Sequence, residues 1–583
     1  MLLKAIKMQV ETRLESSLHN RVYIIPDQDN NPSQVEHPWN IDVKSGSQPK
    51  SRLPKNTQII KVFDHEGVEG RLLILGKPGA GKTTMLLELA KVLVQRAEQD
   101  LSQPVPILLS LSSWQNDQQS IKDWIVAELN SGKYYKVDKD ITKQWLEEGE
   151  IIPLLDGLDE LAASRQEQCV KKLNEFLQPG NWMYPLAVCS RIQEYELYST
   201  QLALNTSLEL QPFNDEQIQE YLRRTGNEQL RNSIKDHREL RQLAQTPFLL
   251  NLIVLSYQRI SLDKWQEFKS SEERLNYLFT AYVEVMLARK YEGKRPSHET
   301  TKHWLGWLAN KLIEQKETEF FIEKMQPTWL EHRKDELIYR LSVGLSFGLM
   351  FRLMFRLIFG LIFGLIFGLS AGGVIETSEI LQFNWKIFWQ KGLIFGLIFG
   401  LIFGLIFGLI FGLIEGLMEG LIFGLIFGLS GGLSGGLMVG LTTGFKSLKI
   451  ETRTSPNQGI WKTLQNAVII GLSGGLIFGL SGGLIFGLSG GLIFGLSRGL
   501  IFGLSRGLIF GLSGGLIFGV NHGGMACIQH FILRLILYRN GHIPWNYAHF
   551  LDYATDRLFL QRVGGGYRFI HDLLRQHFAE NYR

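Results

Sequence analysis

The chain divides into two parts with different hydrophobic patterns. Up to about residue 340, short apolar runs alternate with mixed polar segments, whereas from Leu341 to Gly523 apolar residues and glycine follow one another almost without a break. Within 71–215 the apolar runs have strand length and alternate with helical patterns, which predicts a parallel sheet wrapped by helices. From 216 to 340 apolar residues recur every three or four positions, so this region is predicted to be helical.

Residues 1–70 precede the predicted sheet. They begin with a short amphipathic helix to about His19, which is interrupted by charge and lacks the continuous apolar core of a signal peptide. A polar stretch rich in Asn, Pro, Gln and Ser follows to Pro54. The segment is too short to be an independent effector domain. We expect it to pack on the domain that follows and to carry no chemistry of its own.

A glycine-rich turn between a predicted strand and a predicted helix is the most informative motif. Gly76–Thr84 follows the apolar run Leu72–Leu75 and precedes the helical pattern Met85–Ala90. Its spacing is G-x-x-x-x-G-K-[ST], in which backbone N–H groups and the helix N-terminus bind phosphate. We expect Lys82 to reach the β- and γ-phosphates and Thr83 to ligate Mg²⁺. The predicted nucleotide-binding residues of this turn are Gly76, Gly79, Ala80, Gly81, Lys82, Thr83 and Thr84.

A second motif begins at Ile151–Asp156, an apolar strand pattern that ends in a carboxylate. Beside a phosphate-binding turn, such a carboxylate holds the hydration shell of Mg²⁺, so Asp156 and Thr83 form the predicted metal site. Asp159 and Glu160 follow where a base could orient an attacking water. The alternative is that these acidic residues are merely solvated at the end of a strand.

A further strand is predicted at Pro185–Arg191. Its last residue, Arg191, could sense the γ-phosphate across the site, although a surface salt bridge would give the same local pattern. Leu208–Phe213 resembles an edge strand, and Asn214 or Asp215 is placed to cap the helix that follows.

Three of these segments and a fourth, in the helical region, together resemble one family. Gly76–Thr84, the Asp-Gly-x-Asp-Glu cluster at 156–160, Cys189-Ser190-Arg191 and Gln245–Leu250 are similar to the motifs of NACHT domains, which belong to the STAND class of P-loop NTPases. The resemblance covers about 70–340, and Ser17–Asn20 and Pro38–Asn40 also resemble the lead-in of bacterial, particularly cyanobacterial, members. It implies ATP or ADP with Mg²⁺ as ligands, Arg191 as the sensor arginine, and Pro247 as the proline that packs on the adenine.

The second part of the chain is a repeat array. Gly-Leu-Ile-Phe units occupy 360–368 and 392–412, and an eight-residue form runs from 471 to 518. Apolar runs of this length are transmembrane candidates, and glycine at every fourth position allows close helix packing. Because a period of four exceeds 3.6, we expect the glycine stripe to wind around each helix. A membrane β-barrel, a soluble glycine-rich array and an aggregation-prone assembly are the alternatives.

Charged residues interrupt the array at a few positions. Glu415 and Glu419 predict a hairpin tip between helices at about 393–413 and 421–441, because charge inside a span is costly. Arg498 and Arg506 lie eight residues apart, about 80° around a helix, and could line one polar seam. The other two interruptions are Arg352 and Arg356. Three hairpins, or six spans, are expected, with a short first pair within 341–375.

The last sixty residues return to a globular pattern. Helix, strand, glycine turn and strand run from Phe550 to His571, and a helix follows at 572–581, which predicts a winged helix. Phe569-Ile570-His571 with Phe578-Ala579 resembles the close of the NACHT winged helix, and this implies that His571 contacts the ADP phosphates. The expected domains are an N-terminal lead-in (1–70), a nucleotide-binding core (71–215), a helical subdomain with the start of a winged helix (216–340), the transmembrane array (341–523) and the end of the winged helix (524–583).

The array is thus expected to be inserted into a split lid, whose two parts must lie on one side of a membrane. The loop between its halves carries Lys446, Lys449, Arg453 and Lys462, which favours the cytoplasmic side. The net charge of +4 and the pI of about 8.7 are too mild to indicate nucleic acid. The three cysteines stand far apart without a C-x-x-C motif, which favours a reducing compartment and neither a disulfide framework nor a zinc site.

These observations lead to one hypothesis and two alternatives. The protein is expected to be a slow ATPase that acts as a membrane-anchored signalling switch, related to bacterial defence and regulatory proteins, with self-association as homo-oligomers and the array as effector. In the first alternative the array is only an anchor. In the second the chain is an ATP-driven transporter, which would need a polar substrate pathway that the array hardly offers.

Overall fold

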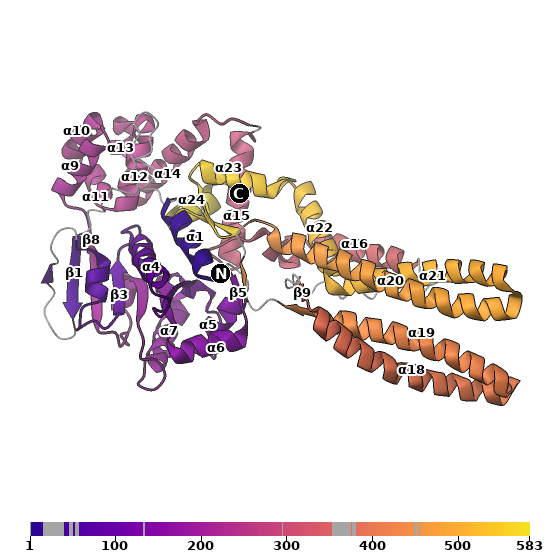
Figure 1. Ribbon diagram of the computed structural model, residues 1–583. Helices are drawn as coiled ribbons and strands as arrows, with labels where there is room; N and C mark the ends of the chain where they lie inside the picture. The colour runs from indigo at the N-terminus through magenta and orange to yellow at the C-terminus, as the bar shows by residue number, and fades with distance from the viewer. Residues whose placement is uncertain are drawn as a thin grey trace. The chain divides into compact units, whose positions relative to one another are not determined.

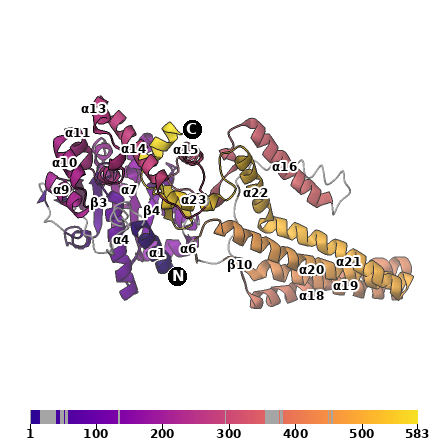
Figure 2. The same cartoon turned by 90° about the horizontal axis from the view of Figure 1, so that it is seen from above.

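The computed structural model describes residues 2–15, 40–45, 51–52, 57–131, 135–293, 295–352, 375, 381–447, 450–452 and 455–582. By their contacts these residues form two compact units (Figures 1 and 2). Unit 1 comprises Met1–Phe321, Ile450–Pro456 and Asn546–Arg583, and unit 2 comprises Ile322–Lys449 and Asn457–Trp545. The chain therefore leaves unit 1 and returns to it twice.

Unit 1 is built around a seven-stranded sheet with the order β2-β1-β8-β3-β7-β6-β4. The five strands from β8 to β4 are parallel, and β1 and β2 extend the sheet antiparallel beside β8. The prediction of a mostly parallel sheet with helices is confirmed. The strands are β1 (Asn40–Ser45), β2 (Ser51–Arg52), β3 (Arg71–Gly76), β4 (Val105–Ser110), β6 (Ile151–Asp156), β7 (Leu186–Arg191) and β8 (Thr206–Gln211).

The prediction that Leu208–Phe213 is an edge strand is wrong. β8 lies inside the sheet, where Leu208 is opposite Ile74 of β3 on one side and opposite Val43 of β1 on the other. Its alternating burial is that of a strand with one covered face, and this pattern is the same whether or not another strand pairs with it. The partner comes from the N-terminal lead-in, which therefore extends the sheet.

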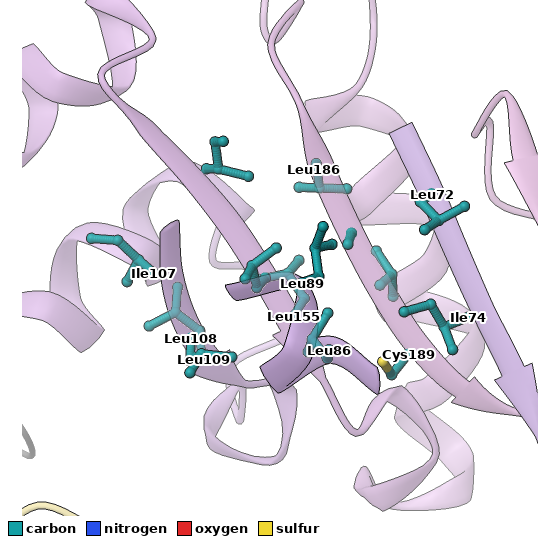
Figure 3. Close-up of a cluster of buried hydrophobic side chains, with 14 of the residues drawn as sticks. Leu72, Ile74, Leu86, Leu89, Ile107, Leu108, Leu109, Leu155, Leu186 and Cys189 are labelled. Carbon is teal, nitrogen blue, oxygen red and sulfur yellow. The ribbon is translucent and has the colours of Figure 1, made fainter. Parts of the chain in front are cut away.

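The helices of the first two hundred residues close a core against this sheet. Leu86 and Leu89 of α4 lie in one buried cluster with the strand residues Leu72, Leu155 and Leu186 (Figure 3). The helix that follows the glycine-rich turn is thus anchored by its apolar face, which fixes the turn itself. The helices are α1 (Leu2–Glu15), α3 (Ile59–Phe63), α4 (Lys82–Gln99), α5 (Ile121–Asn130), α6 (Lys139–Glu148), α7 (Ala163–Phe176) and α8 (Ile192–Glu196).

The region after β8 is helical, as predicted. A capping box of Asn214 and Gln217 begins its first helix, so the expected cap at Asn214 is confirmed. The helices are α9 (Asp215–Arg224), α10 (Glu228–Asp236), α11 (Arg238–Ala244), α12 (Pro247–Ser256), α13 (Leu262–Glu267), α14 (Ser271–Ala288) and α15 (His298–Glu314).

The C-terminal part of unit 1 has the predicted order of helix, strand, glycine turn, strand and helix. Its elements are α23 (Tyr547–Asp556), β12 (Leu560–Val563), β13 (Gly566–Phe569) and α24 (Asp572–Asn581). Assignment of this segment to a winged helix stays a prediction. It is held on the preceding helices by buried groups: the Tyr282 hydroxyl donates to the Leu558 carbonyl at 2.7 Å, and the buried Arg557 guanidinium donates to the carbonyls of Met286 and Arg289.

A short strand from the loop between the two halves of the array also belongs to unit 1. β11 (Ile450–Thr452) pairs antiparallel with β5 (Tyr135–Val137), so that Thr452 is opposite Tyr135. α1 contacts both β11 and α4. Of the basic residues expected in this loop, Lys449 and Arg453 lie outside the described residues.

Unit 2 contains two long helical hairpins whose tips point the same way (Figures 1 and 2). The first hairpin turns at Gly416, next to Glu415, which confirms the predicted tip, and the second turns at Gly495. The first predicted hairpin, within 341–375, falls mostly outside the described residues, as does Arg356. The elements are α16 (Arg333–Arg352), β9 (Leu381–Phe383), α18 (Trp385–Glu415), α19 (Leu417–Gly444), β10 (Phe445–Ser447), α20 (Gln458–Phe494), α21 (Leu496–Gly519), a π-helical turn (Val520–Gly524) and α22 (Met525–Arg539).

The expectation that the glycine stripe winds away from one face of each helix is wrong. In the first hairpin the glycines stay in contact from end to end: a Cβ on Gly392 would lie 2.8 Å from the Gly436 carbonyl oxygen, and one on Gly408 would lie 3.3 Å from that of Gly420. The prediction assumed straight helices with 3.6 residues per turn. Two helices that wind around each other can keep a stripe with a repeat longer than 3.6 residues at their contact. Gly475 and Gly511 meet in the same way in the second hairpin.

Leucine and isoleucine side chains cover the outside of these hairpins. Leu397 and Leu401 are both 67% exposed, and many equivalent positions of the repeat are exposed as well. Arg498 and Arg506 are also exposed, and the Arg506 guanidinium lies 5.6 Å from the centre of the Phe486 ring; their polar seam stays a prediction. Four of the described helices are long and apolar enough to cross a membrane: Trp385–Ile414, Leu417–Gly440, Gln458–Leu488 and Leu496–Arg539.

Candidate nucleotide-binding site

The glycine-rich turn joins β3 to α4 as predicted. Gly79 and Gly81 have φ values of +75° and +99°, which residues with a side chain rarely adopt. A Cβ on Gly79 would also lie 2.9 Å from the Cβ of Phe248, so this position requires glycine for two reasons. The Lys82 ammonium folds back over the turn and donates to the carbonyls of Gly76, at 2.9 Å, and Lys77, at 3.3 Å. The turn is therefore already shaped around the lysine that would meet a phosphate.

The predicted metal ligands lie side by side at the end of β6. The Thr83 hydroxyl donates to Oδ2 of Asp156 at 2.9 Å. A hydroxyl and a carboxylate next to a phosphate-binding turn suit Mg²⁺, which keeps several waters and takes only one or two oxygen ligands from the protein. The two residues therefore fit the ion that the prediction requires, and the ion would bring positive charge to the phosphates.

The two candidate bases occupy different surroundings. Asp159 is held by Arg191, whose Nε lies 2.8 Å from Oδ2 and whose backbone N–H donates to Oδ1 at 3.0 Å. Burial raises the pKa of Asp159, while the positive charges of Lys82 and Arg191 oppose that rise. The Glu160 side chain lies on the cavity wall and stays exposed; the surrounding protein and then the carboxylates of Asp156 and Asp159 raise its pKa. Both candidate bases are therefore weaker acids than ordinary carboxyl groups.

Arg191 is the centre of an ion-pair cluster that reaches the C-terminal segment. Besides Asp159, its guanidinium contacts Glu194 at 3.4 Å and Asp572 at 3.6 Å. Asp572 is the first residue of α24 and also pairs with Arg575. Arg191 thus joins the sheet to the last helix of the chain, and sequence reasoning missed Asp572 as its partner.

Pro247 and His571 converge on the other side of the turn. Pro247 is the first residue of α12, and the next N–H, of Phe248, donates to the Gly79 carbonyl at 3.2 Å. The His571 ring stacks on the Phe248 ring with centroids 3.9 Å apart, and its Nδ1 accepts a hydrogen bond from the Leu573 N–H. The remaining ring nitrogen, Nε2, then carries the proton of the neutral imidazole and lies near Gly79. A donor is thus aimed at the phosphate-binding turn.

These residues surround one cavity of about 210 Å³. Every predicted site residue lines this cavity except Gly76 and Ala80, which belong to the same glycine-rich turn. Sequence reasoning gave several of its residues no role in the site. Phe248 lies in the motif Gln245–Leu250 but was not singled out, and most of the others come from the lead-in, the helical region and the C-terminal segment and carry no motif. The missed residues that line the cavity include Arg13, Phe213, Phe248, Asn251, Thr318, Gln561, Arg568, Asp572 and Arg575.

A strand, a phosphate-binding turn, a helix and a carboxylate at the end of another parallel strand of the same sheet define a P-loop NTPase. The family model of the NACHT domain matches residues 71–229, so this part of the chain is a NACHT domain. Among solved structures, the crystal structure of Cdc6p from Pyrobaculum aerophilum is similar at 15% identity with a TM-score of 0.22, over 43% of this chain and 70% of that chain. A comparison with curated proteins finds no match.

The C-terminal segment is expected to loosen in acid. Burial lowers the pKa of His571 to about 3 and that of His577 to about 4, both below the value of about 6.5 in an unfolded chain. Both rings are neutral when folded, so stability is lost as pH falls below about 6.5, by up to about 1.4 kcal/mol per pH unit for each ring. His577→Phe keeps an aromatic ring beside Phe279 and cannot titrate. Thermal melts between pH 7.5 and pH 4.5 should show a smaller loss in this variant; an unchanged pH slope would contradict the assignment.

Proposed function

We propose that this protein is a membrane-anchored, nucleotide-dependent switch of the STAND class, which binds ATP or ADP with Mg²⁺ and hydrolyses ATP slowly. The observation that carries the proposal is the contact of the C-terminal segment with the nucleotide-binding turn. His571 approaches Gly79, and Asp572 pairs with Arg191 on the sheet. A metabolic NTPase needs no such closure of its site by the end of its own chain.

The ion pairs of Arg191 supply the switching chemistry. With ADP, Arg191 keeps its contacts with Asp159 and Asp572, and the segment that carries His571 stays closed. The γ-phosphate of ATP competes with these carboxylates for the guanidinium, since a charge-assisted bond to phosphate is strong. When the ion pair between Arg191 and Asp572 breaks, α24 is released from the sheet. Asp159 or Glu160 then orients the water for hydrolysis, which resets the closed arrangement.

The array is connected to the switch through β11. This strand belongs to the loop between the two described hairpins and pairs with β5 of unit 1, next to α1. A helix of 30 residues spans about 45 Å at about 1.5 Å per residue, more than the bilayer core of about 30 Å. α18 has 31 residues. We therefore place the hairpins in a membrane and unit 1 in the cytoplasm, with self-association of the open form and the array as effector or anchor.

Replacing Asp572 by Asn is expected to raise ATP affinity about three- to tenfold, the range of a partly buried ion pair, because Arg191 is freed for the γ-phosphate. ADP affinity should change less than twofold. Titration of the full chain in detergent with each nucleotide, followed by light scattering for the oligomeric state, measures both effects. Glu580→Gln, on the exposed side of the same helix, is the matched control. Equal effects of the two variants, or no change in ATP affinity, would remove the basis of the proposed switch.

A further inference from the structure

The N-terminal helix carries an arginine where an apolar residue would be expected. The residues that α1 buries are Leu2, Ile6, Gln9, Val10, Arg13 and Leu14, and Arg13 is only 5% exposed. A guanidinium on the core-facing side of a helix is costly unless it meets acceptors or an anion. Arg13 is the one charged residue among those that α1 buries.

Arg13 points into the nucleotide cavity, where a second arginine joins it. Arg13 from α1 and Arg568 from β13 line the same cavity as Lys82 and Asp156. Both positive and negative groups act on Arg568. Burial and then the charge of Arg13 lower its pKa, whereas three carboxylates, those of Asp156, Glu319 and Glu160, raise it. Arg13, Arg568 and Lys82 thus bring three cations to one cavity, and arginine forms strong charge-assisted hydrogen bonds with phosphate.

The surroundings of Arg568 place this pair at the metal end of the site. The carboxylate that acts on Arg568 most strongly is that of Asp156, the residue that holds the Thr83 hydroxyl. In P-loop proteins the β- and γ-phosphates share the metal held at this strand end. Two further arginines line the cavity: Arg191 pairs with Asp159, and Arg575 donates to the Glu317 carbonyl and pairs with Asp572.

We propose that Arg13 and Arg568 form a subsite for the terminal phosphate of a Mg²⁺-bound nucleoside triphosphate. This inference rests on the proposed nucleotide binding and adds two residues from outside the NACHT match at 71–229. α1 then belongs to the machinery that distinguishes tri- from diphosphate. Because α1 also contacts β11, the same helix links the terminal phosphate to the loop between the hairpins.

The test compares nucleotide affinities of the full chain in detergent with MgCl₂, using ATP against ADP and GTP against GDP. Arg13→Gln and Arg568→Gln should each weaken triphosphate binding about tenfold or more, the size of a lost charge-assisted hydrogen bond, and change diphosphate binding less than twofold. Retained diphosphate binding also shows that the variant is folded. The control Arg562→Gln removes an arginine of β12 that does not line the cavity, and both affinities should stay unchanged.

Arg13→Lys separates charge from folding, since it keeps the cation but loses the planar donor fork. It should recover part of the triphosphate affinity that Arg13→Gln loses. Unchanged triphosphate affinity in both glutamine variants would overturn the subsite, as would an equal loss of tri- and diphosphate binding in Arg13→Gln and Arg13→Lys. If the unaltered chain binds no nucleotide at all, the proposed function itself fails and the subsite with it.

Discussion

Replacing Lys82 by Ala is expected to abolish nucleotide binding, with affinity reduced at least about a hundredfold, or about 2.7 kcal/mol. The Lys82 ammonium is held over the turn by the carbonyls of Gly76 and Lys77. It lines the cavity at the turn that is predicted to bind the β-phosphate. Removal leaves the carbonyl oxygens of the turn facing the phosphates without a compensating charge. Isothermal titration of ATP and of ADP into the full chain would measure both losses.

Lys77→Ala is the matched control for this experiment. Lys77 lies in the same turn, but its side chain is exposed, so its loss should change affinity by less than about threefold, as for a solvent-screened charge. Unaltered ATP affinity in the Lys82 variant would show that the cavity does not bind nucleotide through this turn. Loss of both nucleotides in the Lys77 variant would instead point to a general collapse of the turn.

The sequence predicted those parts of the site whose residues are close together in the chain or stand at the ends of predicted parallel strands. Gly76–Thr84 is one continuous segment, so its spacing alone determines where Lys82 and Thr83 point. Asp156 and Arg191 end apolar strand patterns, and parallel strands bring their carboxyl ends to one edge of a sheet. For the same reason Asp159 and Arg191 were both predicted at the site, although their ion pair was not.

The residues that the sequence did not reveal reach the site through tertiary packing. Arg13 and Arg568 stand almost at opposite ends of the chain, and neither belongs to a motif. One signal was present for Arg13: it falls on the stripe of Leu2, Ile6 and Val10, where a charge is unexpected. β1 was missed because a polar lead-in with two apolar residues gives little strand signal, although its partner β8 supplies a long line of backbone hydrogen bonds.

The repeat array shows which structural features the spacing of residues predicts correctly and which it does not. Composition predicted long apolar helices, and the two glutamates predicted the first tip. The contact face of the glycines was predicted wrongly, because the calculation treated each helix as straight and alone. Once two helices wind together, a four-residue repeat becomes a continuous seam in which backbones touch. Glycine is then required by close packing along the seam, and the Leu and Ile positions face the surroundings. Phenylalanine rings stack across the hairpin, as Phe407 does on Phe427 with ring centroids 4.3 Å apart.

Replacing both Gly400 and Gly404 by Ile is therefore expected to separate the two helices of the first hairpin. A Cβ on Gly400 would lie 2.9 Å from the Gly428 carbonyl oxygen, and one on Gly404 would lie 3.1 Å from that of Gly424. Both obstacles are backbone atoms, which cannot rotate away as a side chain could. Overpacking costs about 1–3 kcal/mol or more at each site, and two successive sites leave no room for a local adjustment.

Hydrogen–deuterium exchange of the full chain in detergent micelles would measure this separation. Amides of α18 and α19 should exchange faster in the double variant, while α20, α21 and the NACHT core keep their protection and serve as internal standards. The matched control is Leu397→Ile with Leu401→Ile, which adds the same β-branched side chain at two exposed positions of the same helix. If both double variants exchange alike, the glycine seam does not hold the hairpin together, and β-branching alone would explain the change.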